Sequence, residues 1–413
     1  PMSKRAAMLI AGMSAATITC APIFADDTTE ILNGQVNLDA AITVVTEGET
    51  DQADAASQSA IGAANALTVD VVERHDIQSD QTFSGSVDAR AETRATIIDG
   101  AAVTTASAMG NSASVINDNG MDAAINQSAL DGSAVNATAR LEVGSYAISS
   151  VTSATASANA FQGTTYGSDT NLTLRQDSGA DVTADGYVLA PDGGLGYAAT
   201  VLGAANGNSA QLEGYHDSPS QVVDVDQDNR GAVTARSGTD AGGTALNHTV
   251  VSSANGNSVW MQNENGYAHI QGEQDNDGAV TAESEILVGN FDADVLSVSA
   301  EGVGNSAILS NIGADAFMGL DQTNNGAVIA RSNLDGDAGG SALVSATAFG
   351  NAATTYVCSE CPVTAWGNTN QTNNAAVSSI VTGRMNTGGV LSGAATAIGN
   401  SATYQTVNPQ AGN

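Results

Sequence analysis

Alternating apolar and polar positions recur along the whole chain in short segments, each of which follows a stretch rich in Gly, Asn and Asp. In "DQTNNGAVIARS", residues 321–332, Val328 and Ala330 are two residues apart and share one side of the segment. This spacing is that of a β-strand with one buried face. Counted from the glutamine, the sixth position is valine in six of eight copies, and the exceptions are Ala41 and Ser133. The eight glutamines are Gln35, Gln81, Gln127, Gln176, Gln227, Gln274, Gln322 and Gln371.

A second phrase, "GNSA" in its commonest form, is also followed by alternating apolar positions, as in "AMGNSAS" and "AIGNSATY". The residue two places after its asparagine is apolar in all eight copies, which predicts another strand with one buried face. A glycine precedes the asparagine in six copies, and we expect it to occupy a tight turn with a positive φ. These glycines are Gly110, Gly207, Gly256, Gly304, Gly350 and Gly399. The eight asparagines are Asn65, Asn111, Asn159, Asn208, Asn257, Asn305, Asn351 and Asn400.

The two phrases form a unit that repeats about eight times, with 46–51 residues between successive glutamines. Each unit is expected to hold four short strands, which can bury their apolar faces only by stacking on the neighbouring units. The sequence therefore predicts an all-β, repetitive β-solenoid, with residues 26–413 as a single array. Equivalent residues would lie about 4.8 Å apart, and a column of Gln or Asn is favourable because each amide both donates and accepts. The eight glutamines and eight asparagines are thus expected to form structural ladders.

Two windings fit this periodicity. If each phrase forms its own coil of about 24 residues, each unit holds two short coils and the array is roughly 75 Å long; if one unit is one coil, the length is roughly 40 Å. The similarity of the two phrases favours the shorter coil. A β-sandwich or a set of small β-domains is the alternative architecture.

The first 25 residues have the three-part pattern of a secretory signal peptide. Lys4 and Arg5 precede an apolar run, and small residues follow up to Ala25, after which cleavage is expected. The alternative is a membrane anchor, but the apolar run is short for a bilayer and is broken by residues such as Gly12 and Ser14. We therefore expect an exported protein.

The charge of the chain is strongly negative. It has 11 Lys and Arg against 44 Asp and Glu, a net charge of −33, and loss of Lys4 and Arg5 with the signal would make it −35. Such an excess of carboxylates repels phosphate backbones and anionic lipid headgroups. Binding to nucleic acid or to an anionic membrane surface is accordingly not expected.

The repeat resembles that of curli subunits, in which Gln and Asn form internal ladders. The resemblance rests on "GNSA" followed by alternating apolar positions, and on the pattern Q-x-N-x-G-A-V-x-A. The longer double unit, the acidic exported chain and the copy number most resemble the D-type holdfast anchor proteins of surface-attaching bacteria. This resemblance implies an outer-surface protein that holds an adhesive polysaccharide to the cell envelope. As partners it implies a small curli-like anchor subunit and a curli-type secretion lipoprotein.

Few residues suggest chemistry. The four histidines share no repeat position, and we interpret them as surface or turn residues; no catalytic or metal-binding motif is complete. Asp224, Asp226 and Asp228 alternate as in a calcium loop, but Asn229 stands where glycine is required and Ala235 where glutamate is required. Weak Ca²⁺ binding by a diffuse acidic surface stays open, and no other cofactor is expected. A polysaccharide-active enzyme with paired aspartates is a further alternative.

Cys358 and Cys361 form a C-x-x-C pair, which in an exported protein predicts a small disulfide rather than a catalytic dithiol. Trp260 lies between two residues expected to point inward, Val259 and Met261, so its side chain should point outward.

These observations predict a structural adhesion protein rather than an enzyme, one that anchors a surface polysaccharide through many weak contacts on a rigid rod. A calcium-dependent carbohydrate-binding or surface-layer module is the alternative. The last unit ends near residue 407 without a polar cap, so we expect an open edge that pairs with a partner subunit or another copy of the chain.

Overall fold

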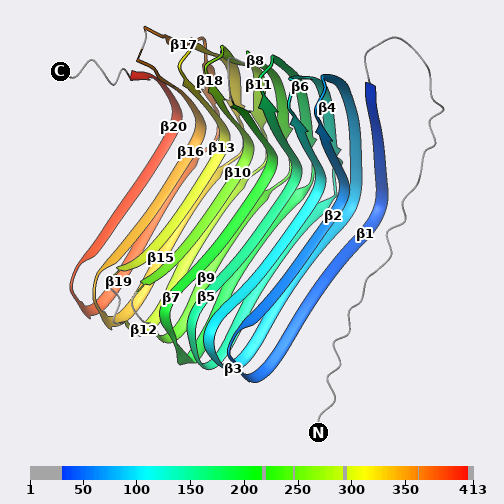
Figure 1. Ribbon diagram of the computed structural model, residues 1–413. Helices are drawn as coiled ribbons and strands as arrows, with labels where there is room; N and C mark the ends of the chain where they lie inside the picture. Colours follow the sequence, from blue (N-terminus) through cyan, green and yellow to red (C-terminus); the bar gives the residue numbers. More distant parts are fainter. Residues whose placement is uncertain (1–29, 216–219, 245–246, 292–294, 361, 408–413) are drawn as a thin grey trace.

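The computed structural model describes residues 30–215, 220–244, 247–291, 295–360 and 362–407. The predicted signal peptide lies outside these residues. The described chain is built from parallel β-strands without a helix, so it holds no helix that could cross a membrane. Figure 1 shows the strands stacked side by side from β1 at one end to β20 at the other.

The strands form one 20-stranded sheet. Their bounds are β1 (Glu30–Ala53), β2 (Ala56–Val71), β3 (His75–Asn117), β4 (Met121–Ala129), β5 (Ala134–Tyr166), β6 (Thr170–Ser178), β7 (Asp181–Tyr215), β8 (Gln221–Asn229), β9 (Val233–Thr244), β10 (Asn247–Glu264), β11 (Ala268–Asn276), β12 (Val280–Phe291), β13 (Val295–Ile312), β14 (Ala316–Asn324), β15 (Val328–Gly339), β16 (Ala342–Cys358), β17 (Ala365–Gly367), β18 (Asn370–Asn373), β19 (Val377–Gly388) and β20 (Leu391–Val407).

Each strand pairs with the strand one whole unit further along the chain, which makes the architecture solenoid-like. Gln35 is in register with Gln81, 46 residues on, and Gln176 with Gln227, 51 residues on. The expected winding of about 24 residues is therefore wrong, because one unit forms one coil. Seven steps of about 4.8 Å separate Gln35 from Gln371, or roughly 34 Å.

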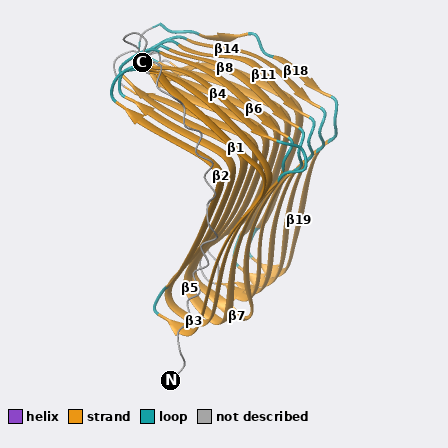
Figure 2. Cartoon of the chain, turned by 90° about the vertical axis from the view of Figure 1, so that its right-hand side faces the viewer, coloured by secondary structure: helices purple, strands orange, loops and turns teal. Residues whose placement is uncertain are grey.

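The two phrases face each other across the core instead of stacking. Within the first coil the chain goes out along β1 and returns along β2, so that Asn37 contacts the carbonyl of Ala64 and Thr46 that of Ser59. The chain reverses its direction between β1 and β2, so residues that are far apart in the sequence of one coil lie opposite each other. Figure 2 shows the resulting bend between an upper and a lower part of the layered sheet.

The three coils from β8 to β16 contain three strands each, such as β8, β9 and β10, and not the four that the sequence predicted; the last coil has four, because its first stretch is divided into β17 and β18. The "GNS" phrase does not interrupt the returning strand: β10 runs unbroken through Gly256 and Asn257. None of the six glycines before the asparagines has a positive φ, so the predicted tight turn is also wrong.

Those glycines instead make room for side chains of the facing layer. A Cβ at Gly207 would overlap Asn229 Oδ1, and one at Gly256 would overlap Asn276 Oδ1. The same holds for Gly304 against Asn324. Glycine is required here by close approach between layers, since its lack of a Cβ leaves space for an amide.

The core consists of three apolar clusters, and the amides lie between two of them. One central cluster contains small residues such as Ala89 and Ala106, and a second contains larger ones such as Ile125 and Met261. The third lies at the other end of the coil, with Leu141 and Leu296. Alternation of buried and half-exposed positions along the strands matches the period-two pattern of the sequence.

One β-branched column runs the length of the sheet. The two apparent exceptions in the sequence pattern disappear in the structure, because turns of different length shift the count: Ile42 pairs with Val87, and Val87 with Val135. In the first coil the shift falls between Asn37 and Ala40, where the register is irregular. The column is Ile42, Val87, Val135, Val182, Val233, Val280, Val328 and Val377.

Candidate functional site

The eight glutamines selected from the sequence lie in one hydrogen-bonded column. From Gln81 onward, the Nε2 of each donates to the Oε1 of the glutamine one coil earlier, over 2.7–3.0 Å. The second Nε2 hydrogen bond crosses the core to a backbone carbonyl: Gln227 donates to Ser258 O at 3.0 Å, directly after Asn257. Every amide donor of an interior glutamine is therefore used within the fold.

The eight asparagines form a second column of opposite polarity. Here each Nδ2 donates to the Oδ1 of the asparagine one coil later, at 2.8 Å in all seven steps. Its second bond returns across the core, as from Asn208 to the carbonyl of Asp228, directly after Gln227. The two columns thus join the layers reciprocally, which explains why the same short phrase recurs twice in each unit.

A third column was missed by sequence reasoning, although its signal is present in Q-x-N. Asn229, Asn276, Asn324 and Asn373 lie two residues after their glutamines, and each donates to the next at 2.7–2.8 Å. All four also donate to backbone in their own turn, for example Asn324 to Gly326 O at 2.9 Å. The preceding coils have Phe83, Ala129 and Ser178 at this position, which interrupts the column.

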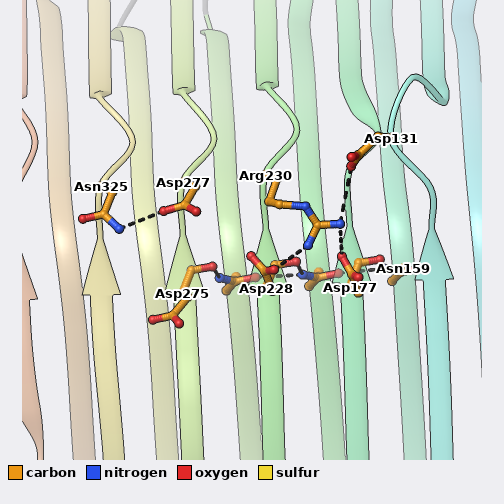
Figure 3. Close-up of polar contacts among 10 residues, drawn as sticks. Asp131, Asn159, Asp177, Asp228, Arg230, Asp275, Asp277 and Asn325 are labelled. Carbon is orange, nitrogen blue, oxygen red and sulfur yellow. Dashed lines mark hydrogen bonds and ion pairs between the residues drawn. The ribbon is translucent and has the colours of Figure 1, made fainter.

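Outward rows carry most of the acidic residues, and neighbouring coils moderate their repulsion. Asn325 donates to Asp277 and Asn370 to Asp321, both at 2.8 Å. Figure 3 shows Arg230 between Asp177, 2.7 Å away, and Asp131, with Asp228 also in contact. Acidic side chains on this face are therefore paired with amides or a guanidinium where these are available.

Like charges nevertheless meet in one row. Glu273 is in register with Asp226 on one side and Asp321 on the other. Burial, and then these neighbouring carboxylates, raise the pKa of Glu273, and burial raises that of Asp275. With Asp224 and Gly272, this row lines a shallow cavity of about 300 Å³ on the outer face.

An aromatic column crosses the same face, and on β11 and β14 it lies four residues before this acidic row. His269 on β11 meets Phe317 on β14 edge-on, with ring centroids 4.7 Å apart, and Phe317 lies 6.0 Å from Trp366 on β17. Tyr267 adds a fourth ring, 6.1 Å from Trp366. Trp366 is 39% exposed. Aromatic rings and carboxylates thus share one outward face.

Residues 50–327 match the model of a family described as holdfast attachment protein D. The chain belongs to the holdfast attachment protein D family. No curated protein matches the chain, and no solved structure does. The predicted resemblance to the D-type holdfast anchor proteins is confirmed, and with it the adhesion role. A holdfast attachment family is one of structural adhesion proteins, which indicates a protein of the cell surface or an exported one.

The histidines of this family member have different environments. The prediction that His248 is a surface residue is wrong. His248 is 1% exposed, and its Nε2 lies 2.9 Å from Thr239 Oγ1. Burial lowers the pKa of His248 to about 4, so it is neutral at pH 7. His216 lies outside the described residues. Over the part of the chain that the structure describes, no three His, Cys, Asp or Glu side chains gather as a metal site.

The predicted outward direction of Trp260 agrees with its half-buried position between buried Val259 and Met261. Cys358 ends β16 and is half-buried, whereas Cys361 lies outside the described residues. Their disulfide stays a prediction.

Proposed function

We propose that this protein is an exported structural adhesion protein that anchors an adhesive surface polysaccharide to the cell envelope. In this proposal the solenoid is a stiff support, associated with the outer membrane, and its outward rows make many weak contacts with the polymer. Many weak contacts on one rigid body hold a polymer firmly without a deep pocket, because each bound segment raises the local concentration of the next.

One observation carries the proposal: the aromatic column lies beside a polar row on the same outward face. His269, Phe317 and Trp366 offer ring faces and edges against which a sugar ring can pack. Four residues along β11 and β14, Glu273 and Asp321 offer acceptors for sugar hydroxyls. At about 3.3 Å per residue, roughly 13 Å separates the rings from the carboxylates, so a polymer lying along the strands can contact both.

The interior supports a structural role. The interior amide donors are used in the columns, and the buried His248 has a hydroxyl partner in the core. The interior of the coils thus serves to hold the outward rows at a fixed spacing. By resemblance, we further propose a small curli-like anchor subunit and a curli-type secretion lipoprotein as partners.

The proposal is tested in the cell. Deleting the gene should release the adhesive polysaccharide into the medium while its synthesis continues, and the full chain supplied in trans should restore retention. Lectin staining of cells and culture supernatants measures the distribution. Unchanged retention in the deletion strain would contradict the proposal.

A further inference from the structure

The two ends of the solenoid are open sheet edges. Among the described residues, β1 and β2 pair only with β3, and β19 and β20 pair only with β15 and β16. Apolar side chains are exposed at both ends, Ile61 at 64% and Val390 at 61%. These four strands contain no proline or lysine, the residues that commonly block an edge. Both ends therefore offer a template for a further parallel strand.

The amide columns give the two ends complementary hydrogen-bonding groups. In the glutamine column, each residue donates toward the first coil, so Gln35 ends it with an N–H and Gln371 ends it with an acceptor oxygen that no described residue fills. In the asparagine column the polarity is reversed: Asn65 ends it with an unfilled oxygen, and Asn400 with a donor. Each donor at one end thus matches an acceptor at the other.

The interrupted third column points to the same match. Its asparagines run to Asn373 in the last coil, and the first coil again has asparagine at this position, Asn37. The coil after it has Phe83 there. An asparagine in the first coil finds no column partner in its own chain, but it would continue the column that ends at Asn373.

The apolar and charged side chains of the first coil also complement those of the last coil. The β-branched column begins with Ile42 and ends with Val377. Residues 30–71 hold seven carboxylates and no Lys or Arg, whereas residues 365–407 hold no carboxylate and one cation, Arg384. Arg384 occupies the same register position as Arg94 in the second coil and Glu49 in the first coil.

We propose that the last coil of one molecule binds the first coil of a second copy, head to tail and in register. Gln35 of one copy then donates to Gln371 of the other, Asn400 donates to Asn65, and Arg384 faces Glu49. Contact between two first coils would oppose donor to donor in the glutamine column and seven carboxylates to seven. Because the contact joins unlike surfaces and continues the stacking of coils along the solenoid axis, it does not close into a ring and generates an open filament. The proposal does not depend on polysaccharide binding.

Sedimentation velocity of the purified mature chain, at increasing concentration in about 0.15 M salt, tests the proposal. We expect a series of species that continues beyond the dimer. Arg384→Glu places a carboxylate against Glu49 and should weaken association about tenfold or more, since like charges at an interface are costly. The matched control is Arg236→Glu, the same change at a side chain that is 52% exposed on β9, in the fifth of the eight coils, and it should leave association unchanged.

The decisive variant is Glu49→Arg combined with Arg384→Glu, which restores an opposite pair only if these two positions meet between copies. Recovery of association supports the contact, and circular dichroism melting confirms that each variant is folded. The proposal is overturned by a chain that stays monomeric at all concentrations, by growth that stops at the dimer, by assembly that needs a different protein, or by a double variant as weak as Arg384→Glu alone.

Discussion

At the scale of single residues, stability depends on amides that donate twice and accept once. Gln227 donates to Gln176 and to Ser258 O, and it accepts from Gln274, while being 1% exposed. A carboxylate could not replace it, because it has no N–H to donate and would meet its own charge in a column of equals. This is why the inward rows are amides and the carboxylates lie outward.

Replacing this amide should therefore be costly. Gln227→Leu leaves the oxygens of Gln176 and Ser258 and one N–H of Gln274 without partners, and each buried unsatisfied group costs about 1–3 kcal/mol. We expect the free energy of unfolding to fall by about 3 kcal/mol or more in urea titration. Gln211→Leu is the matched control, since Gln211 is exposed and, among the described residues, bonds only to Glu213. Equal effects of the two substitutions would contradict the ladder account.

His248 should make the protein sensitive to acid. Its pKa is lowered to about 4 by burial, below the value near 6.5 of an unfolded chain, so the unfolded state binds the proton more readily. Its contribution is complete above about pH 6.5 and is lost as the pH falls toward 4, by roughly 3 kcal/mol. His248→Leu, which matches Leu296 in the next coil, should flatten the stability curve over this range. An unchanged slope in thermal melts from pH 7 to 4 would show that His248 is not buried as described.

At the scale of strands, the period-two pattern predicted the inward faces and the all-β class, because one buried face per strand leaves a direct mark on the sequence. The winding could not be predicted in the same way. Similar phrases arise whether they stack or face each other, and only the pairing of Gln35 with Gln81 and the bond from Gln35 to Ala66 separate the two cases.

Glycines of one layer lie opposite asparagine side chains of the facing layer, and the sequence spacing alone could not show this relation. Gly207, Gly256 and Gly304 each face an asparagine of the third column. One coil earlier, the two equivalent positions hold Ala158 and Ser178, so a methyl group is present where the amide is absent. The chain therefore already contains one coil in which a smaller side chain, Ser178, makes room for the methyl group of an alanine, Ala158.

This relation predicts the effect of a single methyl group. Gly207→Ala should destabilise the protein by about 1–3 kcal/mol, the usual cost of overpacking, because the new Cβ overlaps Asn229 Oδ1. Adding Asn229→Ser should recover part of the loss, as measured by urea unfolding. Gly34→Ala is the control, since nothing lies within 4 Å of its Cβ position. A loss at Gly34 as large as that at Gly207 would contradict the explanation.

At the scale of the whole molecule, rows of like charge reduce stability in return for solubility. The pKa of Glu273 is raised by burial and by its acidic neighbours, so the folded state binds its proton more readily than the unfolded state does. Stability from this row should therefore increase as the pH falls toward 4. Glu273→Gln should raise the melting temperature at pH 7 and in low salt, and the gain should shrink in high salt or near pH 4. A gain that is independent of pH and salt would point to packing instead.

The outward face is the part of the molecule that the sequence described least. The repeat pattern located the columns, but it could not show that His269, Phe317 and Trp366 lie side by side, because they are separated by whole coils. Their adjacency depends on a register that only the structure provides.

The central claim is that this face holds the polysaccharide. The most direct test measures the affinity of the purified full chain for the polysaccharide released from its own cells. Phe317→Thr combined with Trp366→Thr should weaken binding about tenfold or more, while Trp260→Thr, an outward tryptophan on the returning layer, should bind as the unchanged protein does. Equal affinity in all three proteins, or an equal loss in both variants, would contradict the account.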